Sequence, residues 1–357
     1  MKKVIALTLA LSMLFTFLAA CAGVAAPPNT EMPVETLLFT DSAERVIEVP
    51  ANIERIAVTG PLAQMVLFAL APDLMVGIAA AWDPSASKYL DTKYMELHYL
   101  GALYGTRGDL NLETLLVARP DIVIDIGESK DSIAEDMDAL QEKCGIPFVH
   151  ISASTVTTGE TYRKLGELLN MKARAEALAV YCEDIYTMTF DLMERVGEEN
   201  RVSLVYCMGD TGLNVLARGS FHAEVLDMMG LNAAVLDNPT AMGTGNEVDM
   251  EQLLVWNPEV ILFAPGSVYD MVGGDPVWSQ LSAISNGRYF ETPIGPYNWL
   301  GFPPSVQLYL GMLWLGYLMY PEYVDYDLYE KVAEYYALFY HSELTREMFA
   351  ELTVNAL

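Results

Sequence analysis

The sequence has few of the residues from which metal and catalytic sites are most often built. Its 357 residues include only 4 histidines, which are far apart and form no HExxH pattern (His98, His150, His222 and His341). That scarcity argues against the three-histidine sites expected of a zinc- or manganese-binding protein. No GxSxG motif, Walker A loop or Rossmann glycine fingerprint is present either. We therefore predict no catalytic residue, no metal site and no resident cofactor, and we expect that the protein is not an enzyme.

Basic residues and cysteines are scarce as well. The 20 Lys and Arg residues face 48 Asp and Glu residues, which gives a formal charge of −28. The electric field of so negative a protein repels nucleic-acid phosphates, so a nucleic-acid partner is excluded. The charge is consistent with an exported protein that must stay in solution, or with a surface that binds a basic partner. Besides Cys21, the chain has Cys144, Cys182 and Cys207, which form no CxxC motif. We expect buried free thiols, although the sequence leaves a disulfide open.

A targeting segment opens the chain. Two lysines and an apolar run over residues 4–18 precede the sequence Leu-Ala-Ala-Cys, which ends at Cys21. This order predicts a signal peptide over residues 1–20, and it resembles the lipobox of bacterial lipoproteins, in which the cysteine is acylated. We expect lipidation at Cys21, a tether over residues 21–37, and a protein anchored on the outer face of the cytoplasmic membrane or in the periplasm.

A segment of the sequence occurs twice. Residues 111–127 read NLETLLVARPDIVIDIG, and 138 positions later residues 249–265 read DMEQLLVWNPEVILFAP. Over the first 14 positions, 5 are identical and 6 are like-for-like exchanges. This spacing is larger than the roughly 20 to 50 residues of solenoid repeats, so it indicates two similar halves.

The likeness extends on both sides of this segment, through strand and helix patterns that occur in the same order. The corresponding pairs are residues 55–60 and 201–206, 63–70 and 223–229, 74–80 and 231–236, and 145–149 and 287–290. Alternating strands and helices indicate mainly parallel sheets with helices on both faces. We therefore predict an α/β fold of two Rossmann-like lobes.

One uninterrupted helical pattern joins the halves. Residues 172–196 contain no Pro or Gly, which predicts a single stiff helix of about 37 Å at about 1.5 Å per residue. A very apolar run at 306–320 is too short to span a membrane and predicts a buried helix, and two amphipathic helices follow within 328–352. The predicted domains are an N-terminal lobe over 38–170, the connecting helix over 171–198, and a C-terminal lobe over 199–357.

The lipobox-like segment, two β/α lobes, a long connecting helix and the doubled NLE…PDIVI and DME…PEVIL segments resemble a known family. It is the class III substrate-binding proteins of ABC importers, the ferric siderophore, haem and cobalamin group. Residues 40–50 and 297–305 are similar to the same family, and the resemblance covers essentially all of the mature chain. It implies a monomer that works with an ABC permease and its ATPase.

In that family, one glutamate on each lobe docks into arginines of the permease. The matching positions here are Glu113 and Glu251. In each repeat three apolar residues occupy one face of the predicted helix, so the glutamate projects elsewhere. A glutamate in the first turn of a helix is also ordinary helix-start chemistry. Because the residue recurs at the same register in both halves, we favour docking.

The ligand is expected in loops beyond the carboxyl ends of the strands, where open parallel sheets gather their contacts. Aromatic faces offer apolar contact, and arginine offers a fork for carboxylate or catecholate oxygens. The candidates are Trp82, Tyr104, Arg107, Tyr206, Arg218, His222, Tyr269, Tyr297 and Trp299.

These features lead us to expect a lipid-anchored binding protein that captures a ferric siderophore or haem between its lobes and delivers it to a membrane permease. Cobalamin is the alternative within the class. Molybdate or a nickel chelate is a further one, because some relatives have shifted ligand. A surface hydrolase on a two-lobed scaffold is the alternative outside the class, and it requires a catalytic constellation that the sequence does not signal.

Overall fold

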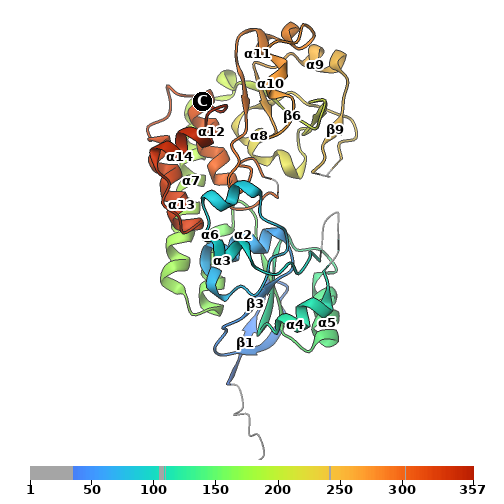
Figure 1. Ribbon diagram of the computed structural model, residues 1–357, viewed down its shortest axis with the longest axis vertical. Coiled ribbons are helices and arrows are strands. Elements are labelled where there is room, and N and C mark those ends of the chain that lie inside the picture. The colour runs from blue at the N-terminus through green and yellow to red at the C-terminus, as the bar shows by residue number, and fades with distance from the viewer. Residues whose placement is uncertain (1–34, 104–107, 109, 241–242, 302) are drawn as a thin grey trace, which may run out of the picture. The chain divides into compact units, whose positions relative to one another are not determined.

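The computed structural model describes residues 35–103, 108, 110–240, 243–301 and 303–357. The predicted signal peptide, the tether before residue 35 with Cys21, and the candidates Tyr104 and Arg107 lie outside the described residues. Residues 36–357 form a single unit by their contacts, so the predicted boundaries between lobes stay a prediction. Within this unit, two β/α halves follow one another along the chain, with a long helix between them in sequence (Figure 1).

The first half is built on a parallel three-stranded sheet in the order β3-β4-β5, preceded by an antiparallel β1-β2 hairpin. Its elements are β1 (Thr36–Thr40), β2 (Val46–Pro50), β3 (Ile56–Val58), α2 (Pro61–Leu70), α3 (Thr92–Met95), α4 (Leu112–Ala118), β4 (Ile122–Gly127), α5 (Ile133–Cys144), β5 (Phe148–Ser152) and α6 (Thr158–Leu168). Ile124 packs into the core cluster that includes α2, whereas Val123 packs into a second cluster with α4 and α5. Both faces of β4 are therefore covered, as its apolar run predicts.

The second half holds a sheet in the order β11-β10-β6-β7-β9, with β8 also paired to β6. Its elements are β6 (Ser203–Met208), β7 (Asn214–Val215), α8 (Glu224–Met229), β8 (Leu231–Asn232), β9 (Asn246–Glu247), α9 (Met250–Trp256), β10 (Val260–Phe263), α10 (Tyr269–Val272), α11 (Ser282–Ser285) and β11 (Tyr289–Glu291). The pairs β6-β10 and β10-β11 are parallel, whereas β7 and β9 pair antiparallel. The α/β fold with mainly parallel sheets is thereby confirmed.

Strand register shows that the two halves are equivalent. β4 lies between β3 and β5 as β10 lies between β6 and β11. The paired residues are Ile56 with Ile122 and Val123 with Phe148 in the first half, and Leu204 with Val260 and Ile261 with Tyr289 in the second. Residues 122 and 260 are separated by the 138 positions of the sequence repeat, so the predicted duplication is present in the sheets.

The repeated helices α4 and α9 begin and end in the same way. Asn111 Oδ1 accepts a hydrogen bond from the Thr114 amide at 3.0 Å, and Asp249 Oδ1 accepts one from the Gln252 amide at 2.7 Å. Both helices end at a residue in the left-handed region, Arg119 with φ 48° after α4 and Asn257 with φ 40° after α9. A proline follows in each case and prevents the helix from continuing.

The second strand predicted in each half is shorter than expected. Residues 74–80 make only isolated bridges, Met75 to Ile56 and Ile78 to Tyr99, and the counterpart β8 has two residues. Gly77 gives the reason in the first half, because a Cβ there would lie 2.7 Å from the His98 carbonyl oxygen. The chain passes so close to residues 98–100 that it changes pairing partner after Val76.

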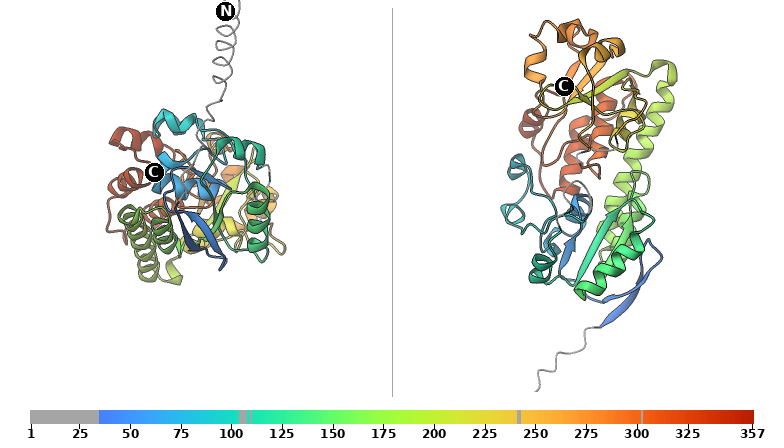
Figure 2. Two further views of the ribbon diagram at one scale, coloured as in Figure 1. Left: turned by 90° about the horizontal axis from the view of Figure 1, so that it is seen from below. Right: turned by 90° about the vertical axis from the view of Figure 1, so that its right-hand side faces the viewer.

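The connecting helix α7 (Lys172–Val196) has the predicted bounds, and the predicted C-terminal helices are present as α12 (Leu308–Met319), α13 (Leu328–Phe339) and α14 (Arg346–Leu352). α12 is buried along most of its length, as predicted, and no described helix is long and apolar enough to cross a membrane. Helices α12 and α13 both contact α7, and the views of Figure 2 show them beside it.

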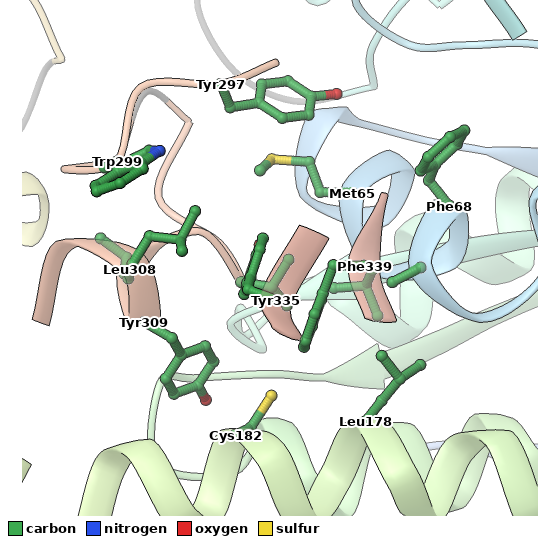
Figure 3. Packing of buried hydrophobic residues seen from close by; sticks show 14 of the residues in the cluster. Met65, Phe68, Leu178, Cys182, Tyr297, Trp299, Leu308, Tyr309, Tyr335 and Phe339 are labelled. Atoms are coloured by element: carbon green, nitrogen blue, oxygen red, sulfur yellow. The ribbon is translucent and has the colours of Figure 1, made fainter. Parts of the chain in front are cut away.

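The core between these helices is aromatic. Tyr309, Tyr335 and Phe339 lie between α7 and the side chains of α2 (Figure 3). The rings of Tyr335 and Phe339 stack with centroids 4.2 Å apart. Cys182 projects from α7 into this core as a free thiol, and burial raises its pKa well above the usual range. Cys207 is likewise buried and free, whereas Cys144 is free and half-buried.

Equivalent caps predict equivalent losses of stability. Asn111→Ala and Asp249→Ala should each lower the free energy of unfolding by about 1 kcal/mol, because each leaves a helix-start amide without its acceptor. Urea unfolding of residues 36–357 measures the free energy of unfolding. Asn111→Ser and Asp249→Ser are the controls: they keep a side-chain acceptor, so they should lower the free energy of unfolding by only a few tenths of the loss in the alanine variants. A loss in one half without a loss in the other contradicts the structural equivalence.

Candidate ligand cleft and docking faces

Two adjoining cavities lie at the carboxyl ends of β3, β4 and β5. Their volumes are about 660 Å³ and about 400 Å³. The other walls come from the second half, residues 219–224 and 303–308. The two cavities share the lining residues Leu62, Ile126, Glu128, Phe221 and Pro304, so they are compartments of one cleft. This is where an open parallel sheet is expected to bind a ligand.

The larger compartment has a mainly apolar wall with a few polar groups. Its apolar lining includes Leu62, Ala79, Ala80, Ala81, Ala102, Ile126, Phe221, Pro303 and Pro304. Polar groups reach it from Thr59, Asp125, Glu128, Lys130 and His222, among others. A volume of about 660 Å³ with such a lining falls in the range of sites for small organic ligands, about 300 to 1,000 Å³.

A buried hydrogen-bond chain fixes Asp125 in the floor of this compartment. Thr59 Oγ1 donates to Asp125 Oδ1, and Asp125 Oδ2 lies 2.7 Å from His150 Nδ1. Because a carboxylate only accepts, His150 Nδ1 donates to Asp125, and His150 Nε2 lies 3.1 Å from Ser129 Oγ. Ser129 Oγ also contacts Ser152 Oγ. Asp125 and His150 are directly paired across β4 and β5, so the sheet itself sets this geometry.

The order of these contacts, carboxylate to imidazole to hydroxyl, is that of a nucleophilic triad. However, Ser129 lines neither compartment, whereas its neighbours Glu128 and Lys130 do. The chain of hydrogen bonds therefore orients Asp125 and anchors the loop that carries Glu128 and Lys130 into the cleft. Sequence spacing did not signal it, because 25 residues separate Asp125 from His150.

The smaller compartment contains a direct hydrogen bond between the two halves. Thr155 Oγ1, beyond β5, donates to Glu224 Oε2 at the start of α8 over 2.7 Å. Burial raises the pKa of the Glu224 carboxyl, the hydrogen bond from Thr155 opposes that shift, and the nearby Glu128 adds to it. A carboxyl group with a raised pKa takes up a proton more readily in the folded protein than in the unfolded chain.

Of the predicted ligand residues within the described chain, His222 lines the cleft. Burial lowers the pKa of His222, so the neutral imidazole is favoured there. Arg218 is exposed beside the lining residue Gly219, and its Nε donates to the Asn232 carbonyl oxygen at 2.7 Å. Tyr269 lies outside the cleft lining and packs on Tyr289, with ring centroids 5.5 Å apart.

The four other predicted residues lie in the core. Trp82, Tyr206, Tyr297 and Trp299 are all buried and line neither compartment. Three have polar partners inside the fold: Trp82 Nε1 donates to the Tyr94 carbonyl oxygen, and the hydroxyls of Tyr206 and Tyr297 accept from Asn298 and Gln64. Their sequence positions next to strand ends were consistent with the cleft, but packing takes these rings inward. Contact with a ligand stays a prediction for them.

Most of the lining residues were not among the sequence candidates, and Leu62, Phe221 and Glu224 are three of them. Leu62 follows Gly60-Pro61 at the start of α2, and Phe221 and Glu224 flank the start of α8. Gly60 and the proline mark the end of β3 and the start of a helix, a signal that places Leu62 at a strand's carboxyl end. Phe221 and Glu224 had no signal beyond their closeness to His222.

The matching helices α4 and α9 present the same surface in both halves. Glu113 and Glu251 are exposed in the first turn, and neither makes an ion pair within the described residues. Four residues further on, Val117 is 81% exposed and Val255 is 78% exposed. Residues at this spacing are neighbours on a helix surface, so each half presents a carboxylate beside a solvent-exposed valine.

Within the described residues, no group of three or more His, Cys, Asp and Glu side chains is arranged to hold a metal ion.

Comparison with known proteins gives consistent matches. A model of the periplasmic binding protein family matches residues 56–294. The molybdate-binding protein MolA of Haemophilus influenzae is 26% identical over 328 residues, which cover 85% of this chain and 91% of that protein. The Fe(3+)-citrate-binding protein YfmC of Bacillus subtilis is 23% identical over 194 residues, 52% of this chain and 58% of that protein.

Solved structures agree with these matches. An ABC transporter solute-binding protein from Sulfurospirillum deleyianum superposes with a TM-score of 0.80 at 27% identity, covering 88% of this chain and 98% of the other. A periplasmic solute-binding protein from Veillonella parvula gives 0.73 at 25% identity, covering 90% and 97%.

The family match extends over more than half of the chain, so the protein belongs to the periplasmic binding proteins, in the class III group of ABC-transporter solute-binding proteins. The family resemblance seen in the sequence is thereby confirmed. Members of this family bind small-molecule ligands and work with ABC permeases. They are solute-binding proteins rather than enzymes. Because they are periplasmic binding proteins, membership in the family indicates a location outside the cytoplasm.

The raised pKa of Glu224 predicts a pH dependence of stability. The folded carboxyl holds its proton to higher pH than the unfolded one, whose ordinary value is 4.5, so acidification from pH 7 towards that value should favour folding through this group. Relative to Glu224→Gln, the thermal midpoint of the wild type should rise as the pH falls from 7 to about 5. The exposed Glu347→Gln serves as control, and a wild type that follows Glu224→Gln at every pH contradicts the assignment.

Proposed function

We propose that the protein captures a metal chelate, a ferric siderophore or haem, in the cleft and delivers it to an ABC permease. The observation that supports this most strongly is the larger compartment of about 660 Å³, with its mainly apolar wall and a small set of polar groups. A chelate wraps its metal in an organic shell, and such a shell fills an apolar chamber of this size by the burial of its own surface.

Molybdate is the second candidate. The similarity to the molybdate-binding protein MolA over 85% of this chain favours it. An oxyanion requires donors or positive charge around it, and the lining of the cleft includes Lys130 and His222 beside the carboxylates of Asp125, Glu128, Glu224 and Asp227. Anionic oxygens of a siderophore meet the same acceptors, so the size and mainly apolar wall of the larger compartment lead us to place the chelate first.

The ligand class is tested by calorimetric titration of residues 36–357 with ferric citrate, a ferric tris-catecholate, haemin, cobalamin and molybdate. We expect saturable one-to-one binding of at least one chelate, with molybdate at least about tenfold weaker, a difference of about 1.4 kcal/mol. Saturable binding of molybdate alone transfers the proposal to the oxyanion. Absence of binding by every probe contradicts the proposal as a whole.

The remaining parts of the proposal concern the cell surface and the transporter. We propose that Cys21 is acylated after removal of residues 1–20, that the protein acts as a monomer, and that an ATPase partner drives the permease. The exposed glutamates on α4 and α9 support docking, because two equivalent acidic points on one molecule match a partner with two equivalent basic points.

Charge reversal at both docking positions should abolish uptake. Glu113→Arg with Glu251→Arg places cations against the basic surface proposed on the permease, while the ligand affinity should stay within about threefold because both residues lie outside the cleft. Uptake in cells and calorimetric titration of the purified variant measure the two effects. Glu142→Arg with Glu194→Arg gives the same change of charge on other exposed helix positions. Normal uptake by the first variant removes these residues from the interface.

A further inference from the structure

Phe221 is one of the five residues that line both compartments and so lie at the divide between them. Leu62 and Pro304 are among the others, and 43% of Phe221 is exposed. The residue begins a short 3-10 turn, Phe221–Ala223, in which the Ala223 amide donates to the Ser220 carbonyl oxygen at 2.9 Å. Its ring meets the His222 ring edge to face, with centroids 5.5 Å apart. The ring therefore stands in the cleft on a turn that is held from both sides.

The same turn reaches both compartments with different chemistry. His222 lines the larger compartment, where most of the wall is apolar. Glu224 lines the smaller one, where Thr155 holds its carboxylate and Ser154 and Ser220 add hydroxyl groups. A ligand that touches Phe221 thus meets a mainly apolar wall on one side. On the other side it meets the hydroxyl and carboxyl groups of the smaller compartment, which are set among the apolar side chains of Val66, Val306 and Leu308.

We propose that Phe221 is the residue that determines ligand specificity, and that the ligand has two parts. An apolar or aromatic face packs on the Phe221 ring in the larger compartment, and an arm with hydrogen-bond donors enters the smaller compartment towards Glu224. This proposal rests on the proposed function and narrows its ligand class. It excludes a bare tetrahedral oxyanion, which has no apolar face and carries no donor when fully deprotonated.

The physical reason is the cost of leaving the ring in water. A half-exposed aromatic side chain in a concave wall gains by covering its face, and aromatic contacts add specificity through their fixed geometry. Large aromatic side chains held in pockets contribute a disproportionate share of binding energy in recognition sites. Replacing the ring by a methyl group also widens the opening between the two compartments, so a ligand that fits against the ring loses its lateral support.

The test is a calorimetric titration of wild type, Phe221→Ala, Phe221→Tyr and Phe190→Ala with haemin, a ferric tris-catecholate, cobalamin and molybdate. For the tightest probe, Phe221→Ala should weaken binding at least about tenfold, and Phe221→Tyr should stay within about threefold. Phe190 is 55% exposed on α7 and lines neither compartment, so Phe190→Ala should stay within about twofold. Circular dichroism verifies that each variant is folded.

The outcomes separate the two proposals. If a chelate binds and Phe221→Ala changes its affinity less than threefold, the specificity role is overturned while the proposed function stands. If molybdate is the tightest probe, both the two-part ligand and the chelate are overturned. If no probe binds the wild type, the proposed function is contradicted, and the role of Phe221 falls with it.

Phe221→Trp adds a second readout. A ligand that packs at this position must shift the fluorescence emission of the introduced indole. No shift at saturation overturns the proposed contact.

Discussion

The walls of the cleft depend on the aromatic core in which α13 packs against α2 and α7. Arg174 of α7 donates to the Ala69 carbonyl oxygen at 2.7 Å and to the Leu338 carbonyl oxygen at 2.6 Å, so one guanidinium joins the ends of three helices. Around it the stacked rings of Tyr335 and Phe339 bury large apolar surfaces, of about 150 to 250 Å² for each aromatic side chain. α13 comes from the end of the chain, whereas α2 carries Leu62 into the cleft. One core therefore supports elements from both halves.

This shared core restricts how the protein responds to a ligand. Tyr309 of α12 donates to the Thr155 carbonyl oxygen at 2.8 Å, and Gln64 of α2 donates to the Tyr297 hydroxyl at 2.9 Å. These bonds and the unbroken 25-residue α7 stiffen the connection between the halves, so we expect any closure around a ligand to be small. A rigid frame limits ligand-driven change to the residues that face the cleft.

Sequence patterns predicted the frame well because they depend on periodicity. Apolar runs placed the buried strands, the lack of Pro and Gly placed α7, and the duplicated segment placed α4 and α9 at the same register. The same patterns carry no information on which way a ring turns at the end of a strand. Trp299 illustrates this: its carbonyl oxygen would lie 2.6 Å from a Cβ at Gly311, so α12 lies close against this segment and the indole is fully buried. A close approach such as that of Gly311 to Trp299 joins residues that are distant in sequence, so local patterns do not predict it. The position of Phe221 in the cleft also depends on contacts between distant residues, and the sequence analysis did not find it for that reason.

The two halves are alike on α4 and α9, where we propose docking, and unlike at the candidate cleft. The exposed pair Glu113 and Val117 has its counterpart 138 positions later, with the same cap and the same left-handed end to the helix. By contrast, the cleft takes strand ends and Leu62 from the first half, but Phe221, Glu224 and Pro304 from the second. A ligand held between two halves is touched by both at once, so each wall can specialise separately. A partner that meets each half at an equivalent point requires equivalent surfaces. The proposed docking and the candidate ligand site make these two different demands, which agrees with a repeat that is kept on α4 and α9 and absent from the cleft.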